Sequence, residues 1–198
     1  MKLVIATRNK HKLEEICEIF SVPGLEIVSA LDYPDIPDVE EDGTTFEANA
    51  IKKAVSLAKA TGLLALADDS GLEVDALGGA PGLYSARYSP LPGATDADRR
   101  AHLLVNLRGL PRPWTAHFHC TAALALPGGE MHFSDGDVYG EILPEERGSN
   151  GFGYDPLFLL PELGRTMAEL TREEKNTLSH RARAVHAALP AIKKVLGL

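Results

Sequence analysis

The feature that most restricts the fold is a pair of short, nearly continuous apolar runs, residues 3–7 and 64–67. Runs without polar alternation are typical of strands that are covered on both faces. An amphipathic helix is expected to begin near His11, and another, capped by Thr44 or Thr45, is expected to run to about residue 60. The first third of the chain therefore predicts strand–helix units.

The remainder of the chain predicts a different arrangement. A helix is expected from Asp96, and residues 116–126 are expected to form a long strand that ends at the turn "PGGE". Two further strands are expected at 131–135 and 137–143, and a last helix near Ser179. Strand–helix units followed by a hairpin predict an α/β fold with a mixed central sheet flanked by helices. The 198 residues suit a single domain, residues 1–198.

Composition excludes several classes of protein. The formal net charge of −8 argues against general affinity for nucleic-acid backbones or anionic membranes. Cys17 and Cys120 are the only cysteines, which favours a reducing compartment over a disulfide framework. No signal peptide and no stretch long enough to span a bilayer is evident. We therefore expect a cytoplasmic protein that binds neither nucleic acid nor membrane.

The first polar loop, "TRNKHK" at residues 7–12, follows the first strand and opens a helix. Backbone N–H groups at a helix N-terminus, together with a hydroxyl, an amide and cations, suit a phosphate group. The alternative is a polar helix cap with solvated lysines. The loop is not a P-loop, because the glycine spacing of that motif is absent.

Two acidic segments suggest a metal ion. Asp68 and Asp69 follow an apolar run directly and are expected at the end of a buried strand, where adjacent carboxylates repel each other. A second acidic run ends in Glu40, Glu41 and Asp42. Carboxylates from two loops, with waters and substrate phosphates, are how proteins hold Mg²⁺. The alternatives are an Asx or Ser turn at 68–71 and a solvated acidic loop at 40–42.

The last polar region is "GFGYDP" at 151–156, followed by "LTREEKNTLSHRARA" from residue 170. Glycines around Phe152 and Tyr154 suit an aromatic face on which a base stacks. Lys175, His180 and Arg181 add hydrogen-bond donors, although an ordinary basic helix terminus has the same composition. Cationic loops, carboxylates and an aromatic pocket together describe a nucleoside triphosphate site.

At these residues the sequence strongly resembles the inosine triphosphate pyrophosphatase family, also called Ham1-like. The resemblance covers nearly the whole chain, in family order, through "IATRNKHKLEEI", "EEDGTTFEANAIKKA", "ADDSGLEVDALGGAPGLYSARYS", "GFGYDPLF" and "LTREEKNTLSHR". One departure lies in the first segment, where Arg8 and His11 replace glycines that are usual in the family.

The resemblance implies Mg²⁺-dependent hydrolysis of ITP, dITP and XTP to the monophosphate and pyrophosphate. It also implies an elongated two-lobed fold with the active site in a cleft between the lobes, and a homodimer. Asp69 would be the catalytic carboxylate and a metal ligand, completed by Glu41 or Glu40. The residues implied to bind substrate are Thr7, Arg8, Asn9, Lys10, His11, Lys12, Lys53, Ser70, Phe152, Gly153, Tyr154, Asp155, Lys175, His180 and Arg181.

Two other functions remain open on the residues alone. A nucleotide phosphatase or related pyrophosphatase with another base preference would share the phosphate and metal segments. A regulatory nucleotide-binding module would share the binding residues and lack turnover.

Overall fold

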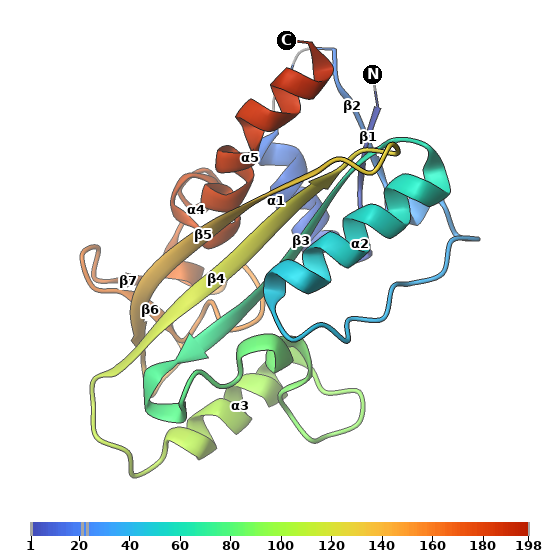
Figure 1. Ribbon diagram of the computed structural model, residues 1–198. Coiled ribbons are helices and arrows are strands. Elements are labelled where there is room, and N and C mark those ends of the chain that lie inside the picture. Colours follow the sequence, from blue (N-terminus) through green and yellow to red (C-terminus); the bar gives the residue numbers. More distant parts are fainter. Residues whose placement is uncertain (1, 21, 23, 198) are drawn as a thin grey trace. The chain divides into compact units, whose positions relative to one another are not determined.

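The computed structural model describes residues 2–20, 22 and 24–197, which form an α/β structure (Figure 1). The strands are β1 (Lys2–Ile5), β2 (Glu26–Ser29), β3 (Leu64–Val74), β4 (Trp114–Ala125), β5 (Met131–Ile142), β6 (Phe158–Leu160) and β7 (Arg165–Thr166). The α-helices are α1 (Lys10–Ile19), α2 (Phe46–Thr61), α3 (Asp96–Leu107), α4 (Arg172–Leu178) and α5 (His180–Leu196).

The strands form one mixed sheet in the order β2-β1-β3-β4-β5-β6-β7. β1 runs parallel to both β2 and β3, whereas β6 runs antiparallel to β5 and β7. The predicted α/β class with a mixed sheet and flanking helices is thus confirmed. Within the described residues, no helix combines the length and apolar character needed to cross a membrane.

The chain divides into two compact units. The first contains residues 1–69, 120–136 and 179–198, and the second contains residues 70–119 and 137–178. In the first unit, Leu3, Ile5 and Leu66 face one apolar cluster with side chains of α1 and α5, whereas Val4 and Ala65 face another with α2. Both faces of these strands are therefore covered, as their apolar runs predict. The second unit has its own core, to which α3 contributes Leu103 and Leu107.

Local capping sets the ends of α2. The Thr45 hydroxyl accepts a hydrogen bond from the Ala48 N–H at 3.0 Å, which selects Thr45 over Thr44 as the N-cap. Gly62 ends the helix in the left-handed conformation with φ of 69°, which costs glycine little because it has no Cβ. Both ends of this helix follow from neighbouring residues.

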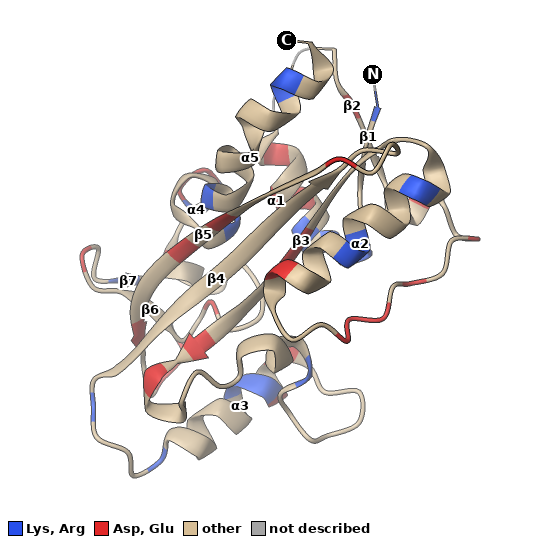
Figure 2. Cartoon of the chain, in the orientation of Figure 1, with Lys and Arg blue, Asp and Glu red and all other residues tan. Residues whose placement is uncertain are grey.

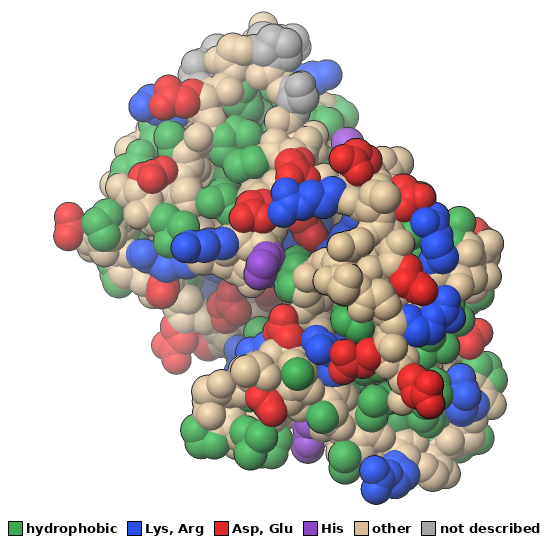
Figure 3. Space-filling view, turned by 180° about the vertical axis from the view of Figure 1, so that it is seen from behind, with side chains coloured by type: hydrophobic (Ala, Val, Ile, Leu, Met, Phe, Trp, Pro, Cys, Tyr) green, Lys and Arg blue, Asp and Glu red, His purple; other side chains and the backbone are tan. Residues whose placement is uncertain are grey.

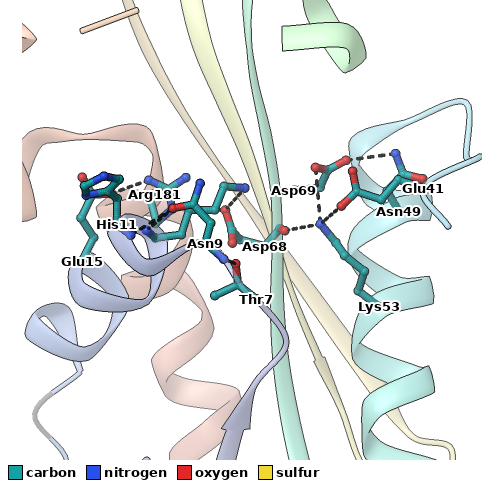
Figure 4. Close-up of polar contacts among 11 residues, drawn as sticks. Thr7, Asn9, His11, Glu15, Glu41, Asn49, Lys53, Asp68, Asp69 and Arg181 are labelled. Atoms are coloured by element: carbon teal, nitrogen blue, oxygen red, sulfur yellow. Dashed lines mark hydrogen bonds and ion pairs between the residues drawn. The ribbon is translucent and has the colours of Figure 1, made fainter. Parts of the chain in front are cut away.

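The expected end of β3 at residue 67 is wrong, because the strand continues to Val74. Asp68 and Asp69 lie inside the strand and are only 2% and 8% exposed. Neighbouring residues of a strand point to opposite faces, so the two carboxylates face different partners rather than each other (Figure 4). Those partners offset the cost of burying two carboxylates, which is why the strand does not end before them.

Residues 131–142 form one strand rather than the two expected at 131–135 and 137–143. Gly136 lies within β5, and a Cβ there would come within 2.3 Å of the His180 carbonyl oxygen. The glycine is required by the close approach of α5, not by a turn. The short elements β6, β7 and α4 were not predicted, because their runs are too brief to show a period.

Candidate functional site

The loop between β1 and α1 carries the predicted phosphate-binding residues, and its amides are partly occupied. Asn9 is the N-cap of α1, and its Oδ1 accepts hydrogen bonds from the N–H groups of His11 at 3.0 Å and Lys12 at 3.3 Å. Asn9 in turn donates its own N–H to Thr7 Oγ1 at 3.2 Å. An anion at this helix start would therefore meet Asn9 first, together with the exposed side chains of Lys10 and His11.

Arg8 contacts the acidic loop that precedes α2. Its guanidinium forms an ion pair with Asp38 and donates to the Ile36 carbonyl at 2.6 Å. Acidic residues recur along this loop in Figure 2. Arg8, one of the two residues that depart from the family pattern, thus links the β1–α1 loop to the acidic loop.

Asp68 lies in a buried network of charges. Lys12 Nζ is 2.9 Å from Asp68 Oδ2, and Arg181 Nε donates to the same oxygen at 3.2 Å. Arg181 also pairs with Glu15 and is 1% exposed. Burial opposes the ionisation of Asp68, but Lys12, Arg181 and Lys53 outweigh it and hold its pKa below the usual range.

Arg181 is itself held in its charged form. Burial alone would lower its pKa, but the carboxylates of Asp68 and Glu15 raise it above the usual value. Its guanidinium, predicted to meet the base, is engaged by these two carboxylates. His180, the other residue at the start of α5, is 6% exposed.

Asp69 faces α2 on the other side of β3 (Figure 4). Asn49 Nδ2 donates to Asp69 Oδ2 at 3.0 Å. Lys53 Nζ lies 2.7 Å from Glu41 Oε1, 2.6 Å from the Asp68 carbonyl oxygen and 3.5 Å from Asp69 Oδ1. One ammonium group therefore stands between the two carboxylates that were predicted to hold a metal.

Burial raises the pKa of Asp69, and Glu41 adds to that rise, while Lys53 and Lys12 oppose it. Burial would lower the pKa of Lys53, but Asp69, Asp68 and Glu41 raise it overall. The lysine is a stable cation, and Asp69 is the more basic carboxylate of the adjacent pair. A raised pKa suits a group that accepts a proton.

The carboxylates of Glu41 and Asp69 suit a divalent cation whose other ligands would be waters and phosphate oxygens of a substrate. Glu41 and Asp69 already converge on one positive charge, the Lys53 ammonium, so the geometry favours Glu41 of the two candidates. Among the described residues, no group of three or more His, Cys, Asp or Glu side chains is arranged to hold a metal. Mg²⁺ is commonly held by only one or two carboxylates plus waters and phosphate oxygens.

The segment 151–155 belongs to the second unit and forms a folded loop. Asp155 Oδ2 accepts hydrogen bonds from the Phe152 N–H at 2.9 Å and from Lys175 Nζ at 2.6 Å. The same ammonium lies 4.8 Å from the centroid of the Phe152 ring. A Cβ at Gly151 would lie 2.1 Å from Asp155 Oδ2 at a φ of 74°, so this position requires glycine.

Only one of the two aromatic rings in this loop is accessible. Phe152 is partly exposed, whereas Tyr154 is 4% exposed and donates its hydroxyl to the Ser85 carbonyl at 2.9 Å. The expectation that Tyr154 presents a stacking face is therefore wrong. Its ring belongs to the core of the second unit.

The predicted residues are distributed over both units. Those from Thr7 to Lys12, with Lys53, Asp69, His180 and Arg181, belong to the first unit, and Ser70, residues 152–155 and Lys175 belong to the second. Asn49 and Glu15 were missed. Asn49 had a signal, since it lies four residues before Lys53 and so on the same face of α2. Glu15 had none, because its partner Arg181 is 166 positions away.

Comparison with known proteins identifies the family. The model of the Ham1 family matches residues 3–191. This chain belongs to the Ham1 family. The "dITP/XTP pyrophosphatase" of Desulforamulus reducens is 50% identical over 98% of this chain and 97% of its own length, and that of Geobacter sulfurreducens is 55% identical over 93% and 92%.

Solved structures of Ham1 proteins have the same fold. The HAM1 protein from Coxiella burnetii is 41% identical, with a TM-score of 0.89 over 98% of this chain and 99% of the other. The "nucleoside-triphosphatase / dITP/XTP pyrophosphatase" from Mycobacterium abscessus is 46% identical, with a TM-score of 0.76 over 96% and 100%. The likeness to these two structures therefore extends over at least 96% of this chain.

Proposed function

We propose that this Ham1 protein hydrolyses ITP, dITP and XTP to the nucleoside monophosphate and pyrophosphate with Mg²⁺ as cofactor. The activity would remove these nucleotides from the cellular pool. The observation that carries the proposal is the cluster around Asp69, in which a buried carboxylate lies beside Lys53, Glu41 and Asn49. Relatives that carry the name "dITP/XTP pyrophosphatase" support the choice of substrate.

Asp69 would orient the attacking water and accept its proton, since burial raises the pKa of this carboxylate. Asn49 holds one oxygen of Asp69 in place, which leaves the other oxygen directed toward Lys53. Lys12 and Lys53 would attract the negative triphosphate. Mg²⁺ held by Glu41 and Asp69 would neutralise charge on the phosphate oxygens.

Phe152 would stack on the purine, because its ring is the accessible one in the segment 151–155. Lys175 and His180 would donate hydrogen bonds to the C6 keto group of hypoxanthine or xanthine. Adenine carries an amine at that position and would leave such donors facing another donor. Sites that depend on such hydrogen bonds reject an analogue by about 10⁴-fold or more.

We infer a cytoplasmic homodimer. Cys17 and Cys120 are both free thiols, as expected in a reducing compartment. The formal net charge of −8 argues against general affinity for nucleic-acid backbones, and acidic and basic side chains lie beside one another on the face drawn in Figure 3. The dimer rests on the family resemblance, and light scattering tests it.

The deciding experiment is product analysis. ITP, XTP, GTP and ATP are incubated with the protein and Mg²⁺, and pyrophosphate and orthophosphate are measured separately. We expect IMP and pyrophosphate from ITP, loss of activity in EDTA and recovery with added Mg²⁺. Orthophosphate with IDP would support the alternative phosphatase, and binding of ITP without turnover would support a regulatory module.

A further inference from the structure

Two side chains from the first turns of α3 bind the backbone of Gly153, in the loop that carries Phe152. Asp96 Oδ2 accepts a hydrogen bond from the Gly153 N–H at 2.8 Å. Arg100 Nη1 donates to the Gly153 carbonyl oxygen at 2.8 Å. The two peptide groups that flank Gly153 are thus each fixed by a side chain from more than fifty residues away.

The two side chains are themselves held. Arg100 donates through Nε to Glu146 at 2.9 Å, with 13% of its side chain exposed, and Asp96 pairs with Arg99 through its other oxygen. The helix start below them is closed by a capping box between Thr95 and Asp98. Leu103 and Leu107 then anchor α3 in the core of the second unit. Asp96 and Arg100 are therefore presented from a rigid element.

The loop needs such support because of its glycines. Gly151 and Gly153 have φ values of 74° and 61°, a region that glycine enters readily along with many others. The ring of Phe152 lies between them. The backbone N–H of Phe152 donates to Asp155, and the backbone N–H of Gly153 donates to Asp96. The direction of the ring therefore depends on α3 as well as on the loop itself.

We propose that Asp96 and Arg100 are positioning residues, which fix the peptides around Gly153 so that the Phe152 ring is already oriented for a purine base. The inference rests on the proposed function, because it assumes that Phe152 stacks on the base. Neither side chain touches the nucleotide. Their contribution is preorganisation, since a loop that is ordered before binding loses less entropy on binding.

The test uses variants that each remove one of the two hydrogen bonds to Gly153. Arg100→Met removes the donors and keeps most of the aliphatic stem. Loss of one hydrogen bond of this kind corresponds to a rise in KM for ITP of about 5- to 20-fold, with kcat within about twofold. The inhibition constant of pyrophosphate, which has no base, should stay unchanged.

A pair of variants at Asp96 separates positioning from a merely structural role. Asp96→Ala removes the acceptor and should raise KM for ITP, whereas Asp96→Asn keeps an acceptor oxygen and should restore most of the affinity. Arg165→Met is the matched control, because Arg165 also pairs with a carboxylate, Glu174, that lies outside the loop 151–155. This control should have the kinetic constants of the wild type.

A double-mutant cycle with Phe152→Ala decides the mechanism. If Arg100 acts through the ring, Arg100→Met should add little to the KM of Phe152→Ala. Additive effects, an equal rise in the inhibition constant of pyrophosphate, or an unchanged KM in Arg100→Met would overturn the inference. If Arg100→Met does not fold, the Asp96 pair decides in the same way. Wild-type protein that neither binds nor hydrolyses ITP would instead refute the proposed function.

Discussion

The cluster around Asp68 and Asp69 and the loop around Phe152 are ordered by different forces. In the first, two carboxylates, two lysines and an arginine compensate one another, largely out of water. In the second, the shape is set by glycine conformations and by hydrogen bonds from backbone N–H groups to the carboxylates of Asp155 and Asp96, with a buried ion pair between Lys175 and Asp155. We therefore expect the cluster to be disturbed most by substitutions that remove a charge. The loop should be disturbed most by substitutions that remove a side chain or hydrogen bond that fixes its conformation.

The largest effect is expected on kcat, from a substitution of Asp69, the proposed catalytic carboxylate of the cluster. Asp69→Asn keeps an oxygen for Asn49 but removes the proton acceptor, so kcat for ITP should fall by about 10³-fold. Pyrophosphate release measures this, with thermal melting to confirm the fold. Asp42→Asn is a control in which an exposed carboxylate paired with Lys52 loses its charge. Wild-type turnover by Asp69→Asn would remove this residue from the mechanism.

The next effect concerns stability. Arg181→Met leaves Asp68 and Glu15 without their shared guanidinium, and removing one partner from a buried ion network costs about 3–5 kcal/mol. Urea unfolding measures the free energy of unfolding. Lys2→Met, which breaks an exposed pair with Glu26, should unfold like the wild type. Equal stability of the two variants would show that the buried charges are not coupled.

The loop is tested by removing its accessible ring. Phe152→Ala should raise KM for ITP by about 10-fold or more, because stacking contributes about 1–3 kcal/mol per base. Phe152→Tyr keeps an aromatic face and serves as the matched control. The inhibition constant of pyrophosphate should be unchanged in both variants. A fall in kcat with constant KM would place Phe152 in the chemical step.

The smallest effect is expected at the buried ring of the same loop. Tyr154→Phe removes the hydrogen bond to the Ser85 carbonyl and should lower the free energy of unfolding by about 1 kcal/mol. KM for ITP should remain close to that of the wild type. A large rise in KM with unchanged stability would show that Tyr154 contacts the substrate after all.

Features that depend on neighbouring residues were predictable. The strand β1, a cap of α2 at Thr44 or Thr45 and its end at Gly62 follow from apolar runs, a hydroxyl and a glycine within a few positions, and the structure selects Thr45. The family motifs gave the polar segments proposed as the site, and those residue roles stay predictions. They could not predict that Asn9 caps the α1 amides or that Arg8 turns toward Asp38, because these depend on side-chain direction.

The end of β3 shows where such local reasoning stops. Two adjacent aspartates after an apolar run predict the end of a strand when only their neighbours are considered. In the folded protein, Arg181 reaches Asp68 from 113 positions away and Asn49 reaches Asp69 from 20. The sequence therefore specified which residues are apolar, flexible or charged. Only the tertiary structure decided which charges pair, because the energy of a buried carboxylate depends on distant groups that folding brings within a few ångströms.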